Sequence, residues 1–284
     1  FEGDFDASKN LLNINSKSDS IRYQGVKFNN NKIESYSQNN KINLVFKSDH
    51  IDLTDSIHLY NYFMYFVSKD KNTKYNAEWD NKVKPQNAGK FAGKMLFDNA
   101  LAILTFDKIF LTSNDSTWSL VTSDTTMIDS SGTVLVKPLY FVNGSQSIKV
   151  QGGLSNKPND KLVFEVQNFG LGQLTPLFGN AVKVDGVLNG TFSLHNTMKN
   201  LAFSSNLHFD KLKINDKDIG DGELKSEYNN EDKYLYLDGY TSLGIPNPMG
   251  EKLKNIVFSG YYYMSKKEES LDISIEAQPA NLTL

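Results

Sequence analysis

Residues 182–194, VKVDGVLNGTFSL, indicate the fold class because apolar and polar side chains alternate along them without interruption. The apolar set runs from Val182 to Leu194 and includes two glycines, Gly186 and Gly190, whereas the intervening positions are mostly polar. Successive side chains of a strand point to opposite faces of its sheet. The alternation therefore predicts a strand with one apolar and one polar face.

The same alternation recurs on both sides of this stretch. A change of phase at Asp210-Lys211 predicts a β-bulge there. Polar segments with turn-forming residues separate the strands. The predicted strands cover residues 118–121, 133–136, 139–142, 147–150, 161–166, 206–214, 223–228, 255–264 and 271–277. The chain is therefore predicted to be all-β, with few short helices.

The first ninety residues are less regular. Apolar side chains at helical spacing predict one helix over about 53–67, and the polar stretch 68–90 reads as a long loop. Residues 91–110 are apolar on both faces, which fits either a buried strand pair or a strand with a short helix. The residues of the predicted helical face are Leu53, Ile57, Tyr60, Met64 and Val67.

A second helical signal is shorter. Leu171, Leu174 and Phe178 are spaced by three and four residues, which places them on one side of a helical turn. Thr175 before Pro176 is a predicted N-terminal cap.

A strand-glycine-strand pattern suggests an internal repeat. It places Gly25, Gly152 and Gly260 in equivalent positions, each followed by a polar turn, a strand and a leucine-type segment such as Leu282 and Leu284. The alternative is a set of unrelated hairpins.

Composition narrows the possible functions. The chain has 284 residues, 39% of them hydrophobic, a net charge of −3 and no cysteine. The near balance of charges predicts no basic footprint for nucleic acid and no polybasic membrane patch. The absence of cysteine excludes thiol chemistry. No apolar run approaches the ~20 residues of a membrane-spanning helix. The chain is expected to be an interior piece of a longer protein.

No catalytic motif is present. The histidines His50, His58, His195 and His208 have no metal-ligand spacing in the sequence, and no nucleotide-binding or hydrolase signature occurs. We therefore predict no enzyme activity, no metal and no cofactor.

Strands with one apolar face must bury that face against something. A closed sandwich or barrel would do so internally, whereas a curled open sheet would leave an apolar trough that needs a ligand. Periodicity does not separate these two arrangements.

A resemblance favours the trough. Residues 184–239 contain Gly186 and Gly190 in one strand, then Leu-x-Phe-x-x-Leu-x-Ile-Asn, then IGDG at 219–222 and a hairpin to YLYLDG. In this order they resemble the TamB family of AsmA-like envelope proteins, in particular its Bacteroidetes forms. The likeness covers roughly residues 91–284 and is weak over 1–90, so these two ranges are the predicted domains.

The resemblance implies a long curled β-sheet (a "β-taco") that carries phospholipid between the inner and outer membranes. It implies a periplasmic location, an inner-membrane anchor before this segment and an Omp85-type outer-membrane barrel as partner after it. Acyl chains would lie against the inward side chains. These are Val182, Val184, Leu188, Phe192, Leu194, Leu207, Phe209, Leu224, Tyr228, Ile256, Phe258, Tyr262, Leu271, Ile273 and Ile275.

Two other readings stay open. An adhesin or glycan-binding protein would have a closed core and exposed aromatics such as Tyr261, Tyr262 and Tyr263. A β-helix enzyme acting on carbohydrate would need clustered carboxylates, for which the sequence offers no candidate pair.

Overall fold

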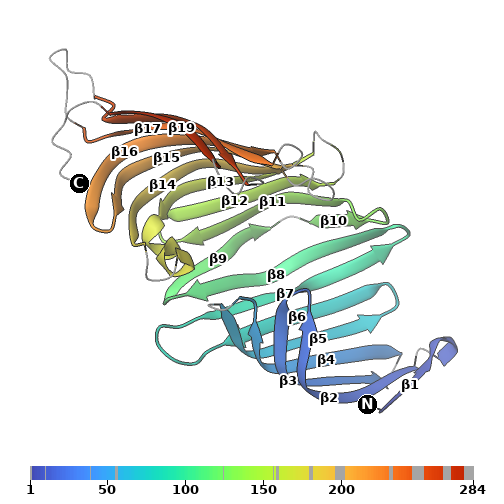
Figure 1. Ribbon diagram of the computed structural model, residues 1–284. Helices are drawn as coiled ribbons and strands as arrows, with labels where there is room; N and C mark the ends of the chain where they lie inside the picture. The colour runs from blue at the N-terminus through green and yellow to red at the C-terminus, as the bar shows by residue number, and fades with distance from the viewer. Residues whose placement is uncertain are drawn as a thin grey trace. The chain divides into compact units, whose positions relative to one another are not determined.

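The computed structural model of the chain is almost entirely β-structure (Figure 1). It describes residues 2–9, 11–38, 40–54, 57–123, 125–155, 157, 160–178, 182–195, 202–229, 233–244, 253–264 and 270–277. These residues contain 19 strands, assigned to one antiparallel sheet, and two 3-10 helices. The predicted all-β fold class is confirmed. Leu282, Leu284 and several predicted turns lie outside the described residues.

The chain divides into two compact units. Unit 1 comprises Phe1–Gly132 and Phe141–Asn143, and unit 2 comprises Thr133–Tyr140 and Gly144–Leu284. The predicted ranges 1–90 and 91–284 meet inside β7 (Ala88–Asp98), which pairs with a strand on each side.

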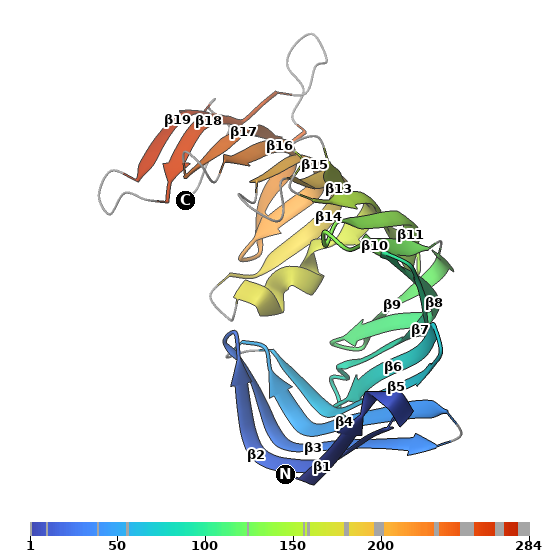
Figure 2. The same ribbon diagram turned by 90° about the vertical axis from the view of Figure 1, so that its right-hand side faces the viewer.

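Unit 1 is a meander of long strands that lie side by side in chain order from β1 to β9 (Figure 2). β10 also pairs with β8. The elements are β1 (Glu2–Asp6), η1 (Ala7–Lys9), β2 (Leu11–Tyr23), β3 (Val26–Gln38), β4 (Lys41–Asp52), β5 (His58–Lys69), β6 (Asn72–Asp80), β7, β8 (Leu101–Ser113), β9 (Ser116–Ser123) and β10 (Thr126–Asp129).

Tight turns keep the strands adjacent. Gln24-Gly25 and Asn114-Asp115 each join two strands and have positive φ at both residues (48° and 85°; 48° and 64°). Two-residue turns of this kind match the right-handed twist of paired strands, and asparagine, aspartate and glycine tolerate the conformation best. The sequence therefore folds back locally, hairpin after hairpin.

The predicted helix over 53–67 is wrong. Residues 58–69 form β5, in which Met64 and Phe66 face one side of the sheet and Phe63 and Tyr65 face the other. β5 is apolar on both faces, so its periodicity also fitted a helix, but its aromatic and β-branched side chains favour a strand. The long loop predicted over 68–90 is also wrong, because β6 occupies its middle.

Residues 91–110 form a strand pair, one of the two predicted alternatives. The pair is not buried on both faces, since Phe97 is 47% exposed.

Unit 2 is a second meander, in which β12 to β19 pair in chain order. Its elements are β11 (Val134–Asn143, shared with unit 1 at its end), β12 (Gln146–Leu154), β13 (Lys161–Gly170), η2 (Leu171–Phe178), β14 (Val184–His195), β15 (Ala202–Ile214), β16 (Lys217–Asn229), β17 (Tyr234–Ser242), β18 (Ile256–Tyr263) and β19 (Leu271–Ala277).

The predicted helical turn is confirmed as η2, but the predicted cap is wrong. η2 begins at Leu171, and Thr175 lies inside it. The Thr175 hydroxyl donates to the Val184 carbonyl (3.2 Å) and accepts from the Val184 N–H (3.3 Å). Thr175 therefore ties η2 to the start of β14. The side chain of Phe178 lies outside the described residues.

The bulge predicted at Asp210-Lys211 is confirmed. The register of β15 on β16 shifts between Phe209 and Leu212, and Lys211 has φ of 53°.

The three-fold repeat is wrong for Gly25. Gly25 occupies a hairpin turn, whereas Gly152 and Gly260 lie inside strands and face a cross-strand carbonyl. A short glycine pattern matches both settings, because glycine tolerates positive φ in turns and close backbone approach in strands.

Little of the described chain is fully buried. In unit 1 the buried apolar side chains are Ile51, Ala88, Ile109 and Trp118, and in unit 2 they are Leu139, Leu162 and Leu171. Most apolar side chains on the strands are half-buried, which differs from the packed core of a closed sandwich.

Candidate functional site

The strand register of unit 2 gathers most of the predicted inward residues on one face. Directly paired residues of neighbouring antiparallel strands have side chains on the same face. Phe192 pairs with Phe164 and with Ser205, and each partner pairs onward in the same way. We call the resulting four rows across β13–β19 the apolar face of unit 2.

The rows of this face follow from the pairings. They are Leu162–Leu194–Phe203–Tyr228–Leu235–Tyr262–Leu271, Phe164–Phe192–Ser205–Ser226–Leu237–Gly260–Ile273, Val166–Gly190–Leu207–Leu224–Gly239–Phe258–Ile275 and Phe169–Leu188–Phe209–Gly222–Thr241–Ile256–Ala277. None of these positions carries a charge.

Thirteen of the fifteen predicted residues belong to these rows. The exceptions lie at the start of β14. Val184 pairs with Ile214 beyond the bulge, and Val182 precedes the strand and is 36% exposed. Strict alternation thus located the face, and it failed only where the bulge changes which residues share a side.

The opposite face is polar. Two of its rows are Glu165–Thr191–Asn206–Lys225–Asp238–Ser259–Ser274 and Val163–Ser193–Ser204–Glu227–Tyr236–Tyr261–Asp272. At its end, burial and the cross-strand partner Lys161 lower the pKa of His195, whose ring contacts Ser204 (3.0 Å). The two faces of one sheet therefore differ sharply in chemistry.

The apolar face remains in contact with solvent. Apart from Leu162 and the glycines, its side chains are half-buried or exposed, up to 63% for Leu271 and 66% for Ile275. An apolar surface of this kind in water favours occupation by something apolar.

Aromatic rings form a continuous run over four strands of this face. Ring centroids lie 5.9 Å apart for Phe164 and Phe192, 5.5 Å for Phe192 and Phe203, and 5.4 Å for Phe203 and Tyr228. The polar residues near its middle, Ser205 and Ser226, hydrogen-bond to each other (2.7 Å). Their hydroxyls are therefore paired within the face.

Several members of this face were not assigned from the sequence. Phe164, Leu235 and Leu237 stand beside residues that are also apolar or aromatic, so alternation did not reveal their side. Phe203 lies just before the predicted start of its strand. Cross-strand register places them on this face, since Phe164 pairs directly with Phe192 and Leu235 with Tyr228, and the sequence does not show that register.

Unit 1 has an apolar face of its own. Its rows include Ser35–Leu44–Phe66–Tyr75–Gly93–Phe106 and Ile33–Phe46–Met64–Ala77–Phe91–Ile109. The Trp79 ring lies over Gly89, where a Cβ would overlap it. Tyr75 donates to the Thr105 carbonyl (3.1 Å), and burial, together with Asp107, raises its pKa to about 12.

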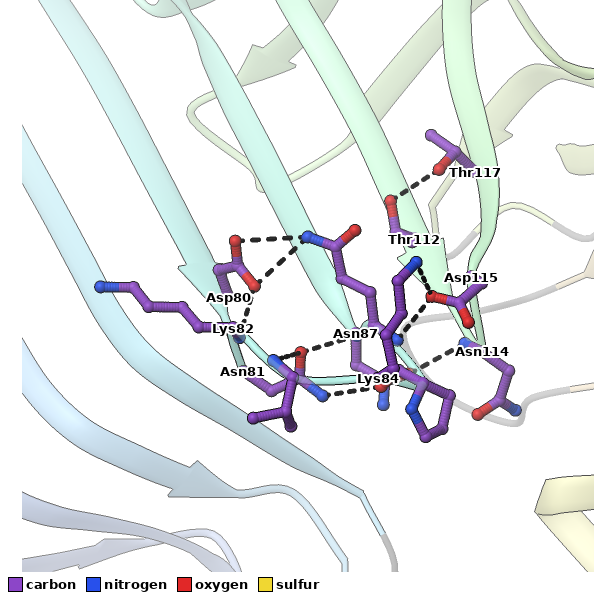
Figure 3. A network of polar contacts seen from close by, with 12 residues as sticks. Asp80, Asn81, Lys82, Lys84, Asn87, Thr112, Asn114, Asp115 and Thr117 are labelled. Atoms are coloured by element: carbon purple, nitrogen blue, oxygen red, sulfur yellow. Dashed lines mark hydrogen bonds and ion pairs between the residues drawn. The ribbon is translucent and has the colours of Figure 1, made fainter.

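A network of polar contacts fixes the loop between β6 and β7 (Figure 3). The Gln86 N–H and the Lys84 ammonium both donate to Asp115 Oδ1 (2.8 and 2.6 Å). The Asn114 N–H donates to Asn87 Oδ1 (3.1 Å), and the Asn87 N–H to Asn81 Oδ1 (3.1 Å). Lys84 lowers the pKa of Asp115 through its hydrogen bond, and the Gln86 N–H adds to this.

This network borders a cleft of about 500 Å³ that is lined by polar residues such as Asp80 and by apolar ones such as Phe63 and Phe110. The polar groups of the network are paired within the protein, which favours a structural role for it.

We expect Asp115→Ala to free the loop between β6 and β7, because the Lys84 ammonium and the Gln86 N–H lose their acceptor. Hydrogen exchange should then be faster at the Gln86 amide, whereas Asp98→Ala, at a separate exposed ion pair with Lys71, should leave it unchanged. Equal exchange at Gln86 in both variants would contradict this role.

Two of the histidines meet at one carboxylate, a contact that their sequence spacing did not suggest. His58 Nδ1 lies 2.7 Å and His50 Nε2 3.7 Å from Asp52 Oδ1, and Asn29 Nδ2 donates to Asp52 Oδ2 (3.0 Å). The hydrogen bonds from His58 and then Asn29 lower the pKa of Asp52. The cluster closes the β4–β5 hairpin.

This cluster predicts a pH dependence. A carboxyl whose pKa is lower in the folded state stabilises that state fully above its ordinary value of 3.8, and the contribution is lost as pH falls toward the lowered pKa. Asp52→Asn should therefore flatten the rise of the urea midpoint with pH in this acidic range. An unchanged slope in the variant would exclude the linkage.

The three consecutive tyrosines named for the adhesin alternative are divided between the two faces of the sheet. Tyr262 belongs to the apolar face, whereas Tyr261 and Tyr263 lie on the polar face with Tyr234 and Tyr236. The Tyr261 ring lies 5.4, 5.1 and 6.1 Å from those of Tyr234, Tyr236 and Tyr263.

Within the described ranges, no group of three or more acidic or histidine side chains is placed to hold a metal ion. Nor does any helix there have the length and apolarity to cross a membrane.

Comparison with known proteins adds no relative: no protein family, curated protein or solved structure matches this chain.

Proposed function

We propose that the chain is an interior segment of a TamB-like bridge, whose apolar faces conduct phospholipid acyl chains between two membranes. The observation that carries the proposal is the uncharged, solvent-contacting apolar face of unit 2 on a sheet whose reverse is polar. If this face belonged to an ordinary hydrophobic core, other parts of the chain would cover it.

The dimensions suit a lipid tail. Seven strands spaced ~4.8 Å apart and four rows spaced ~6.8 Å apart give a surface of about 29 by 20 Å. Each methylene that leaves water for this surface gains about 0.8 kcal/mol. A tail moving over a continuous apolar surface avoids most of the barrier of crossing water, and its headgroup stays in solvent.

No chemical step is required in this function. The face contributes contact area, and its aromatic run from Phe164 to Tyr228 provides polarisable rings along the direction in which strands succeed one another. The proposed partners remain the membranes and an Omp85-type barrel, reached through parts of the protein outside this segment.

The tyrosine cluster on the polar face supports a second candidate, a glycan-binding role. Sugar rings stack on exposed aromatic rings, and Glu227 and Asp272 flank Tyr236 and Tyr261 in the same row. That role needs no lipid on the opposite face.

Mass spectrometry of an organic extract of the purified chain tests the proposal. We expect diacyl phospholipids in near-stoichiometric amount, displaced by added fluorescent fatty-acyl phospholipid. A protein free of lipid that also fails to bind the fluorescent lipid would contradict the proposal. Binding of oligosaccharides by that lipid-free protein would favour the second candidate.

A further inference from the structure

Three lysines face one another on the side of unit 1 opposite its apolar face, a local arrangement that the overall charge balance did not predict. Lys17 of β2 pairs directly with Lys32 of β3, and Lys32 pairs directly with Lys47 of β4. We call these three residues the lysine row. Like charges directly opposite on neighbouring strands destabilise a sheet, so this arrangement is unfavourable for folding.

Only one of the three has a carboxylate partner among the described residues. Lys32 forms an ion pair with Glu34 (2.7 Å), whereas Lys17 and Lys47 are exposed and form none. The pKa of Glu34 is lowered mainly by its hydrogen bond with Lys32, with smaller contributions from Lys47 and Lys17. Glu34 is therefore the one carboxylate that forms an ion pair with this row among the described residues.

Two further carboxylates lie on the same face as the row, but neither forms an ion pair with it. Asp19 and Asp49 lie two residues beyond Lys17 and Lys47, and Asp49 accepts a hydrogen bond from Asn30 (2.8 Å). A neighbouring pair contrasts with the row: Arg22 pairs with Lys27, but Lys27 pairs in turn with Asp52. The like charges there are compensated.

A second set of lysines lies on the same face. Lys74 of β6 pairs directly with Lys94 of β7, and both are exposed. Lys108 of β8 is exposed on this face as well, with its ammonium over the Phe110 ring. By contrast, Lys90 is held by Glu78 (2.9 Å).

We propose that the lysine row docks unit 1 on the surface of a bilayer that contains anionic phospholipid. Charge complementarity selects an anionic partner, because bound phosphates would relieve the repulsion among the three ammonium groups. Lysine carries a compact, mobile charge suited to a laterally mobile lipid surface, whereas directional phosphate recognition favours arginine. Arg22 is the only arginine in the chain. The docking uses the face opposite the apolar one and does not depend on acyl-chain transport.

Vesicle flotation tests the docking. The probes are vesicles of phosphatidylcholine alone and vesicles with about one third phosphatidylglycerol, at low and high salt. We expect binding only to the anionic vesicles and its loss at high salt. Because each lysine near such a surface contributes about 1 kcal/mol, Lys17→Gln with Lys47→Gln should weaken partitioning about thirty-fold.

Three controls separate docking from general charge effects. Lys157→Gln with Lys161→Gln removes the same charge from exposed positions of unit 2 and should bind as the parent does. Lys17→Arg with Lys47→Arg should also keep binding. The thermal midpoint of the Lys17→Gln, Lys47→Gln protein should be equal to or above that of the parent, since a repulsion is removed.

Equal loss of binding in the unit 2 control, or equal binding to both kinds of vesicle, would overturn the proposal. So would preferential binding of an RNA oligonucleotide over anionic vesicles at equal phosphate concentration. A variant of the apolar face that loses its bound phospholipid, such as Phe192→Glu, should still float with anionic vesicles. Failure of the proposed function is therefore distinguishable from failure of docking.

Discussion

Phe192→Glu is expected to remove bound phospholipid from the chain, with at least a ~10-fold loss in affinity. Phe192 lies inside the apolar face and contacts the rings of Phe164 and Phe203. A carboxylate there would have to lose its hydration when a tail covers it, and no cation stands in the four rows to pair with it. Affinity is measured by titration with a fluorescent acyl phospholipid.

The matched control is Ser193→Glu, one residue along β14 on the polar face. Its direct partners are Val163 and Ser204, so the new charge meets solvent and no like charge directly opposite. It should bind lipid as the parent does, and Phe192→Leu should lose little. If Phe192→Glu and Ser193→Glu bind equally well, lipid does not contact this face. Far-UV circular dichroism checks that each variant is folded.

Gly190→Ala is expected to lower the free energy of unfolding of unit 2 by about 2–4 kcal/mol. Gly190 lies in the apolar face with φ of 133°, a conformation that side chains rarely adopt, and a Cβ there would overlap the Asn206 carbonyl oxygen. The strand would have to move away from β15 or give up a pairing. Urea unfolding followed by circular dichroism measures the change.

Gly153→Ala provides the comparison. Its φ is not in the positive range, and the atom nearest to a new Cβ, Asp160 Cβ, is 3.6 Å away, an ordinary contact. We expect a change within about 1 kcal/mol. Equal unfolding midpoints for the two variants would show that β14 and β15 relax without cost, which would remove the backbone role assigned to Gly190.

The local elements were predictable to different degrees. Strands with one polar face, such as 182–194, were found because period-two alternation has no competing explanation. β5 was mistaken for a helix because His58–Lys69 carries apolar side chains on both faces, so a subset of them also fits the helical spacing. Glycine has two unrelated uses in sheets, which explains why Gly25 was matched with Gly152 and Gly260.

The amino-acid sequence by itself determined the all-β character of this protein and the side of the sheet on which most alternating residues lie. These properties depend on neighbours within a few residues, through strand geometry and turn conformation. The tertiary structure alone decided which residues of different strands share a row. Register across strands placed Lys17, Lys32 and Lys47 opposite one another and joined Phe164 to Phe203 through Phe192. Pairing energies between distant segments fix that register, and no local pattern encodes them.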